Sequence, residues 1–155
     1  MPRTSTKGAA AAARVEPAYR LEDQVGFLLR RAYQRASSNL VERIGQYDLT
    51  APQFATLARI HERGTLSQNL LGRLVAMEPA NIRDVVLRLK KRRLVMTQRD
   101  PDDGRLILVS LTPSGTSLVS ELLPIEIECT AKTLAGLNAN EKRLLYELLG
   151  RLADS

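Results

Sequence analysis

The stretch QRDPDDGRLILVSLT, residues 98–112, contains side chains that could do chemistry, because three aspartates and a glycine lie between Arg99 and Arg105. It could be a calcium loop, a hairpin turn or the tip of a surface that contacts a charged partner. A calcium loop needs glycine at its sixth position and a bidentate glutamate at its twelfth. Counted from Asp100, these positions hold Arg105 and Leu111. The sequence therefore excludes this kind of metal loop.

A hairpin turn is expected here, since aspartate and glycine favour the backbone geometry of a hairpin tip. A bare turn does not need the two arginines, Arg99 and Arg105, that bracket it. An arginine at a hairpin tip can reach the DNA minor groove, where the negative potential is deepest. In that arrangement Asp103 orients Arg105 instead of facing phosphate. These residues favour a DNA-contacting wing over an inert turn.

The composition is that of one folded domain, or of a small domain with arms. The chain has 155 residues, of which 44% are hydrophobic and 26% charged, as in ordinary soluble proteins. Its net charge of +6 favours an anionic partner such as nucleic acid. We expect aliphatic helix packing to dominate, because only 4% of the residues are aromatic.

Several classes of site are excluded by what the chain lacks. Cys129 is the single cysteine and His61 the single histidine, so neither an intrachain disulfide nor a zinc cluster can form. No nucleophile constellation or glycine-rich phosphate loop is recognisable, which argues against an enzyme and against a cofactor. The N-terminal apolar run is too short for export, and no segment could span a bilayer. We expect a cytoplasmic protein with a disordered N-terminal arm over residues 1–17.

Helices are predicted where apolar residues recur at three- and four-residue intervals after a polar cap. A first helix is expected from about residue 19 to 44. Thr50 and Pro52 begin a second helix, Ser67 begins a short third one, and Pro79 begins a fourth after the turn AMEP. The segments LVMTQR and RLILVS then predict a hairpin of two short strands around DPDDG.

Two further helices complete the expected fold. Thr112, followed by a proline, begins a helix over about residues 113 to 135, in which Pro124 predicts a kink or break. Asn138 and Glu141 resemble a capping box that opens the last helix. The sequence thus predicts a mainly α fold of six helices with a small β-hairpin.

The order of two short helices, the second basic on its exposed face, and then a hairpin predicts a winged helix-turn-helix. The alternative is a helical hairpin in an all-α domain whose charges are merely solvated, and the turn AME lacks the glycine often found in a helix-turn-helix. Asparagine and arginine suit base edges, and the start of a helix suits phosphate. The candidate DNA-binding residues are Ser67, Gln68, Asn81, Arg83, Asp84, Arg88, Lys91, Arg99, Asp103 and Arg105.

Four segments together resemble the MarR family of bacterial transcriptional regulators, over about residues 20–153. They are LTAPQFATLARI, LSQNLLGRLVAMEPANIRDVVLRLKKRRLV, RDPDDGRLILVSLT and NANEKRLLYELLGRL. The most specific part is the hairpin pattern of Asp103, Arg105 and the strand that ends in Leu-Thr. Two positions depart from the family: Gly104 stands where another arginine is common, and Arg93 where glycine commonly ends the recognition helix.

The resemblance implies a homodimer that places two recognition helices in successive major grooves of a palindromic operator, as a repressor on double-stranded DNA. Residues 18–48 and 112–155 would form the dimerisation helices, and residues 49–111 the DNA-binding lobe. The leucines of the first and last two helices agree with this, because they exceed what one small winged domain could bury. Some of them must also serve the core within the chain.

The resemblance also implies release from DNA by a small aromatic acid or phenol bound between the dimerisation helices and the lobe. Similarity within the family suggests a pyridine carboxylate such as a nicotinate derivative. A lone histidine at a helix end is often a surface or capping group, and Tyr33 and Phe54 could instead be core residues. The candidate ligand-binding residues are Arg30, Arg31, Tyr33, Gln34, Ser37, Phe54, Ala58 and His61.

Two alternative functions remain open from the sequence. Cys129 could make the protein a redox-sensing regulator, although a free cysteine on a helix is usually a small buried hydrophobe. The winged helix could also serve only as a protein interaction module, for which a basic recognition face would be unnecessary.

Overall fold

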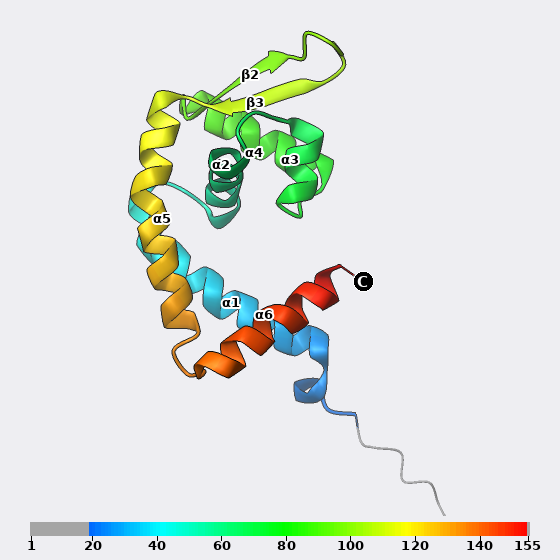
Figure 1. Ribbon diagram of the computed structural model, residues 1–155, viewed down its shortest axis with the longest axis vertical. Coiled ribbons are helices and arrows are strands. Elements are labelled where there is room, and N and C mark those ends of the chain that lie inside the picture. Colours follow the sequence, from blue (N-terminus) through cyan, green and yellow to red (C-terminus); the bar gives the residue numbers. More distant parts are fainter. Residues whose placement is uncertain (1–18, 155) are drawn as a thin grey trace, which may run out of the picture.

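The computed structural model describes residues 19–154 and shows a mainly helical molecule with a small sheet at one end (Figure 1). The N-terminal arm expected over residues 1–17 lies outside the described part. The elements are η1 (Leu21–Asp23), α1 (Val25–Ile44), η2 (Gly45–Tyr47), α2 (Ala51–Arg63), β1 (Leu66–Ser67), α3 (Gln68–Leu74), α4 (Pro79–Lys91), β2 (Val95–Arg99), β3 (Ile107–Leu111), α5 (Pro113–Thr133) and α6 (Ala139–Ala153). The predicted winged helix-turn-helix with six α-helices is confirmed.

The sheet has three antiparallel strands in the order β1-β3-β2, not the two predicted. Val109 at its centre is fully buried and pairs with Leu66 on one side and Thr97 on the other. The sequence missed β1 because a two-residue strand carries no alternating pattern. Through β1, the wing is hydrogen-bonded to the residue that begins α3.

Polar caps begin four of the helices where the sequence predicts them. Thr50 accepts a hydrogen bond from the Gln53 amide at 3.3 Å, and its own amide donates to Oε1 of Gln53 at 3.0 Å. Asn138 forms the same reciprocal box with Glu141. Single side-chain caps open α3 and α5. Each cap satisfies helix amides that would otherwise lack a partner.

Two helices end in left-handed residues that are not glycine. Ala76 has φ 53° and Arg93 has φ 58°. The amide of Leu94 donates to the Leu89 carbonyl at 3.0 Å and that of Arg93 to Lys90 at 2.9 Å, which is the Schellman pattern of a helix end. The chain after α3 and after α4 therefore adopts the left-handed conformation that glycine usually supplies, at a cost in backbone strain.

The beginning of α5 is attached to the end of α4. The Thr112 hydroxyl donates to the Arg93 carbonyl at 2.7 Å, and the Thr112 amide to the Leu94 carbonyl at 3.1 Å. From there α5 continues through Pro124 to Thr133, so of the predicted kink or break the break is wrong. A proline removes only one hydrogen bond of the helix, and packing against α1 and α2 supports both halves of α5.

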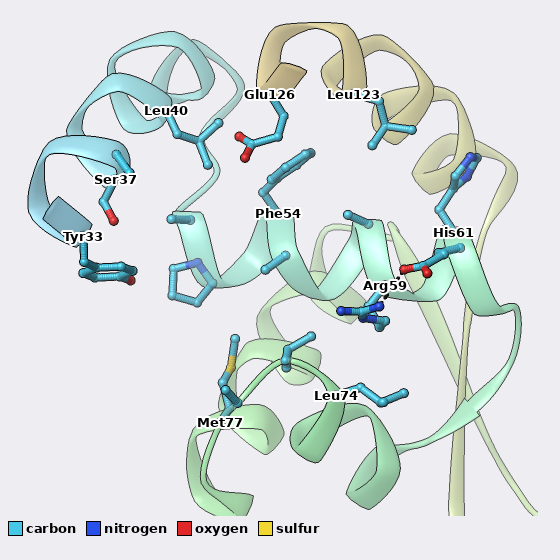
Figure 2. Close-up of a pocket in the computed structure, with 18 residues that line it drawn as sticks. Tyr33, Ser37, Leu40, Phe54, Arg59, His61, Leu74, Met77, Leu123 and Glu126 are labelled. Carbon is cyan, nitrogen blue, oxygen red and sulfur yellow. Dashed lines mark hydrogen bonds and ion pairs between the residues drawn. The ribbon is translucent and has the colours of Figure 1, made fainter. Parts of the chain in front are cut away.

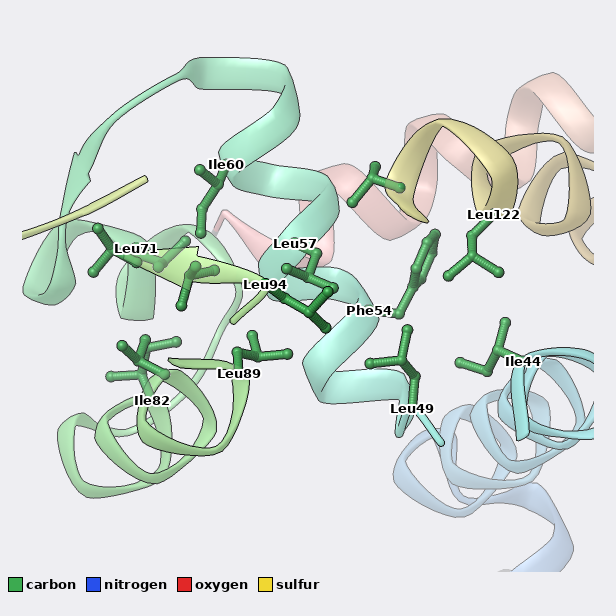
Figure 3. Close-up of a cluster of buried hydrophobic side chains, with 14 of the residues drawn as sticks. Ile44, Leu49, Phe54, Leu57, Ile60, Leu71, Ile82, Leu89, Leu94 and Leu122 are labelled. Carbon is green, nitrogen blue, oxygen red and sulfur yellow. The ribbon is translucent and has the colours of Figure 1, made fainter. Parts of the chain in front are cut away.

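The hydrophobic core continues from the lobe formed by α2, α3, α4 and the sheet into the pair α1 and α5 (Figure 3). Leu71, Ile82 and Leu89 are fully buried under the sheet, and Ile44 and Leu122 are buried between α1 and α5. Helix α2 lies between these groups and contributes to both. No helix in the described residues is long and apolar enough to cross a membrane.

Candidate nucleic-acid interface and ligand pocket

Helix α4 presents a charged outer surface. Ile82, Val86 and Leu89 are buried on its inner side. At 100° per residue, positions 81, 83, 84, 87, 88 and 91 occupy the outer half of the helix. All five predicted residues of α4 lie there and are exposed: Asn81, Arg83, Asp84, Arg88 and Lys91. Asn81 and Arg88 share one flank, and Arg83 lies on the other.

Two features of α4 were not predicted. Leu87 is 50% exposed among the outward charges, and an apolar residue outside the buried stripe is the signal that could have marked it. Arg92 donates from its guanidinium to the backbone carbonyls of Asp48 and Tyr47, at 2.7 and 2.8 Å. This cation ties the end of α4 to the connection between α1 and α2. The basic run KKRR is therefore partly structural.

The hairpin loop holds one arginine outward and one across its base. Nε and Nη2 of Arg105 each lie 3.0 Å from the Asp103 carboxylate, while the Arg105 side chain remains 90% exposed. This pair lowers the pKa of Asp103 and raises that of Arg105. The predicted contact of Asp103 with Arg105 is present, and the approach of Arg105 to DNA stays a prediction. Arg99 instead donates to the Gly104 carbonyl at 2.7 Å and so closes the loop.

Ser67 and Gln68 lie at the start of α3, half-buried. The Ser67 hydroxyl accepts from the Leu70 amide at 3.4 Å, so it is already used as a helix cap. This places both residues at a helix N-terminus, the position from which backbone amides hold phosphate.

A cavity of about 890 Å³ lies between the helix pair α1 and α5 and the lobe formed by α2 and the α3–α4 turn (Figure 2). Its lining is mostly apolar. The residues are Tyr33, Ala36, Ser37, Leu40, Ala51, Pro52, Phe54, Ala55, Ala58, Arg59, His61, Glu62, Leu74, Val75, Ala76, Met77, Leu123 and Glu126. This is the junction at which the resemblance placed an effector.

Five of the eight predicted ligand residues line this cavity: Tyr33, Ser37, Phe54, Ala58 and His61. Arg30, Arg31 and Gln34 do not. Arg31 lies over the ring of Phe27, 5.8 Å from its centroid, and at 100° per residue it is on the side of α1 opposite the lining residues. Gln34 is about 100° around the helix from Tyr33, and Arg30 lies one turn too far toward the N-terminus.

The polar groups of the cavity were largely missed from the sequence. Arg59 donates to Glu62 at 2.7 Å, and Glu62 also lies 3.5 Å from Arg63. Oε2 of Glu126 is buried and has no hydrogen-bond partner among the described residues. Burial raises the pKa of Glu126, and its Thr130 hydrogen bond offsets part of this shift. Glu126 is distant in sequence from the other lining residues, so no local pattern marks it.

Cys129 is buried in the contact between α5 and α1. Its thiol donates to the Asn39 carbonyl at 3.3 Å, and burial, together with nearby Glu126, raises its pKa. A protonated, inaccessible thiol is a poor target for oxidants. The structure gives the redox-sensing alternative no support. The described residues also hold no group of three or more histidine, cysteine, aspartate or glutamate side chains suited to a metal ion.

The fold, the outward basic helix and the wing define a winged helix-turn-helix protein of the DNA-binding class. The family model described as MarR matches residues 49–107, which span the lobe from the start of α2 to the start of β3. The transcriptional repressor NicR of Pseudomonas putida is 37% identical over 137 residues, 88% of this chain and 87% of the relative. The chain belongs to the MarR family of transcriptional regulators and is not an enzyme.

Two solved structures have the same fold. A probable transcriptional regulator from Pseudomonas aeruginosa is 47% identical, with a TM-score of 0.79, over 86% of this chain and 99% of that one. BpsR of Bordetella bronchiseptica, whose DNA binding is regulated by 6-hydroxynicotinic acid, is 38% identical, with a TM-score of 0.85, over 90% of this chain and 99% of its own.

Proposed function

We propose that the protein is a homodimeric repressor that binds a palindromic operator and releases it when a small aromatic acid binds. The cavity carries this proposal. It is lined by the α1–α5 pair on one side and by α2 and the α3–α4 turn on the other. A bound ligand would therefore contact both the proposed dimerisation helices and the lobe proposed to bind DNA.

A second copy of the chain is proposed from helix α6. This helix begins with a full capping box and is amphipathic, yet none of its residues is buried in the described chain. Leu144, Leu148 and Leu149 are exposed, as are Leu28 and Leu29 on α1. A partner copy that covers these leucines supplies the burial that the helix lacks alone.

The DNA contacts proposed are those of α4, the start of α3 and Arg105 in the wing. If the dimer neutralises about ten phosphates, its affinity falls by roughly 10³ to 10⁵ between 50 and 200 mM salt. Asn81, Arg83 and Arg88 read base edges, and Arg83→Ala relaxes specificity at one position. An equal loss on all sequences would show that Arg83 contacts phosphate.

The effector proposed is a pyridine carboxylate of the nicotinate type. Support comes from the likeness to NicR and to BpsR, and from Arg59 in the cavity wall. The bond of Arg59 to Glu62 uses Nη1, which leaves other N–H groups of the guanidinium for a carboxylate. Turning the protein from 99:1 to 1:99 between its two states requires about 5.5 kcal/mol of differential affinity.

Fluorescence anisotropy on a labelled fragment of the protein's own promoter tests this function. We expect salt-dependent binding of a dimer, and release by 6-hydroxynicotinate but not by cyclohexanecarboxylate at the same concentration. Sedimentation in the absence of DNA gives the oligomeric state. Weak salt dependence would refute the proposed phosphate contacts, and a monomer would refute the dimer. DNA binding that no aromatic acid changes would refute the proposed effector.

A further inference from the structure

One oxygen of the Glu126 carboxylate is an acceptor without a donor, although the carboxylate also has a hydrogen bond from Thr130. Its Oε2 is removed from solvent and unpaired among the described residues. In Figure 2 the carboxylate points into the cavity beside Leu40 and Phe54, on the side away from His61. A buried carboxylate oxygen that lacks a hydrogen bond costs folding free energy, so the fold retains a destabilising group where a ligand would sit.

No cation in the cavity wall neutralises this carboxylate. The titratable or charged groups that line the cavity besides Glu126 are Tyr33 from α1 and Arg59, His61 and Glu62 from α2. Arg59 is already paired with Glu62. The causes of the raised Glu126 pKa include burial and a hydroxyl but no arginine or lysine. The cavity thus has a cationic side at Arg59 and a separate acceptor side at Glu126.

We propose that Glu126 accepts a hydrogen bond from an N–H or O–H group of the effector, across the ring from the carboxylate held by Arg59. This inference rests on the proposed function and specifies the ligand's second polar group. An acid that lacks such a donor leaves the Glu126 oxygen unpaired and is bound more weakly. The cavity therefore selects hydroxylated or lactam-bearing ring acids over plain ones.

The spacing along α2 suits one substituted ring. Phe54, near the acceptor side, and Arg59 are five residues apart, which is about 7.5 Å along a helix. This is of the order of the length of an aromatic ring with polar groups at both ends. The intervening wall is formed by small apolar residues, Ala55 and Ala58, against which a flat ring can pack.

Calorimetric titration of two matched ligands tests the role of Glu126 in the full-length protein. The probes are 6-hydroxynicotinate, whose lactam form has a ring N–H, and 6-methoxynicotinate, which has no donor at that edge. Because hydrogen bonds to charged groups are strong, we expect the wild type to prefer the hydroxy acid by about tenfold to 100-fold. Glu126→Ala should reduce this preference to less than about threefold, and Glu126→Gln should keep part of it.

The control is Glu128→Ala, which removes a carboxylate from the same helix but outside the cavity, where it is exposed and paired with Arg43. It should preserve the full preference. Equal affinity of the wild type for both ligands, or an unchanged preference in Glu126→Ala, overturns the inference while ligand-induced DNA release still stands. If neither acid binds or releases DNA, the proposed function fails, and the inference fails with it.

Discussion

Replacing Asp103 with alanine should have opposite effects on operator affinity depending on whether Arg105 is present. In the wild type, Asp103 holds the Arg105 guanidinium through two 3.0 Å hydrogen bonds on a side chain that is otherwise exposed. Removing the carboxylate frees the arginine, which must then be ordered when DNA binds. Without Arg105, the same carboxylate only repels phosphate.

The size of each effect follows from exposure. An exposed ion pair that holds Arg105 in place raises the affinity for DNA by at most about fivefold per wing. The two wings of the proposed dimer together therefore contribute at most about 25-fold. A carboxylate about 8 Å from a phosphate, in water at physiological salt, repels it by less than about twofold per wing. We therefore expect Asp103→Ala to weaken binding about threefold to tenfold in the wild type. In the Arg105→Ala background, it should strengthen binding about twofold.

The assay is a double-mutant cycle by fluorescence anisotropy on the promoter fragment, repeated from 50 to 200 mM salt. Asp102→Ala is the control, because it removes the same charge from the same loop. It leaves the hydrogen bonds between Asp103 and the Arg105 side chain in place. It should strengthen binding slightly in both backgrounds. If Asp103→Ala strengthens binding in both backgrounds as well, the pair does not position Arg105 for DNA.

Four further changes test other features. Arg93→Gly should raise the thermal midpoint by stabilising the fold about 1 kcal/mol, since glycine tolerates φ 58°; a lower midpoint would contradict the strain. Gly115→Ala should destabilise by about 1–3 kcal/mol in a denaturant titration, because its Cβ would overlap the Leu94 carbonyl. Glu126 has a raised pKa in the folded state, so the folded protein loses stability as pH rises and this carboxyl ionises. Glu126→Gln, which cannot ionise, should therefore raise the thermal midpoint at pH 7 but not near pH 4. Cys129→Ser and the wild type should keep equal DNA binding after peroxide treatment. A loss of DNA binding confined to the wild type would support the alternative of a redox-sensing regulator.

The elements of the fold were predictable where a local signal exists. A side chain that can cap a helix predicts where that helix begins. The structure has such a cap at each of the four predicted positions, Thr50, Ser67, Thr112 and Asn138. The failures share a different cause. Strand β1 exists only because β3 passes beside it, and the continuity of α5 through Pro124 depends on helices packed against it, so neither is encoded nearby in the sequence.

The candidate sites divide in the same way. The outward charged and polar residues proposed on α4 follow from one helix period, whereas Leu87 on the same side was missed. The cavity is assembled from α1, α2, the α3–α4 turn and α5, so its membership depends on how these pack. Periodicity places Arg31 on a helix but does not say which side of that helix faces the lobe, and it is silent on Glu126.

Because α5 is attached to the end of α4, a tilt of α5 would also rotate the end of α4. Glu126 lies eleven residues beyond Gly115, about 16 Å along the axis, while Thr112 anchors the near end to Arg93, just after α4. A ligand that tilts the far end by only about 1.5 Å would therefore rotate the anchored end by about 5°. A small movement at the cavity would in this way reorient α4, the helix proposed to contact DNA.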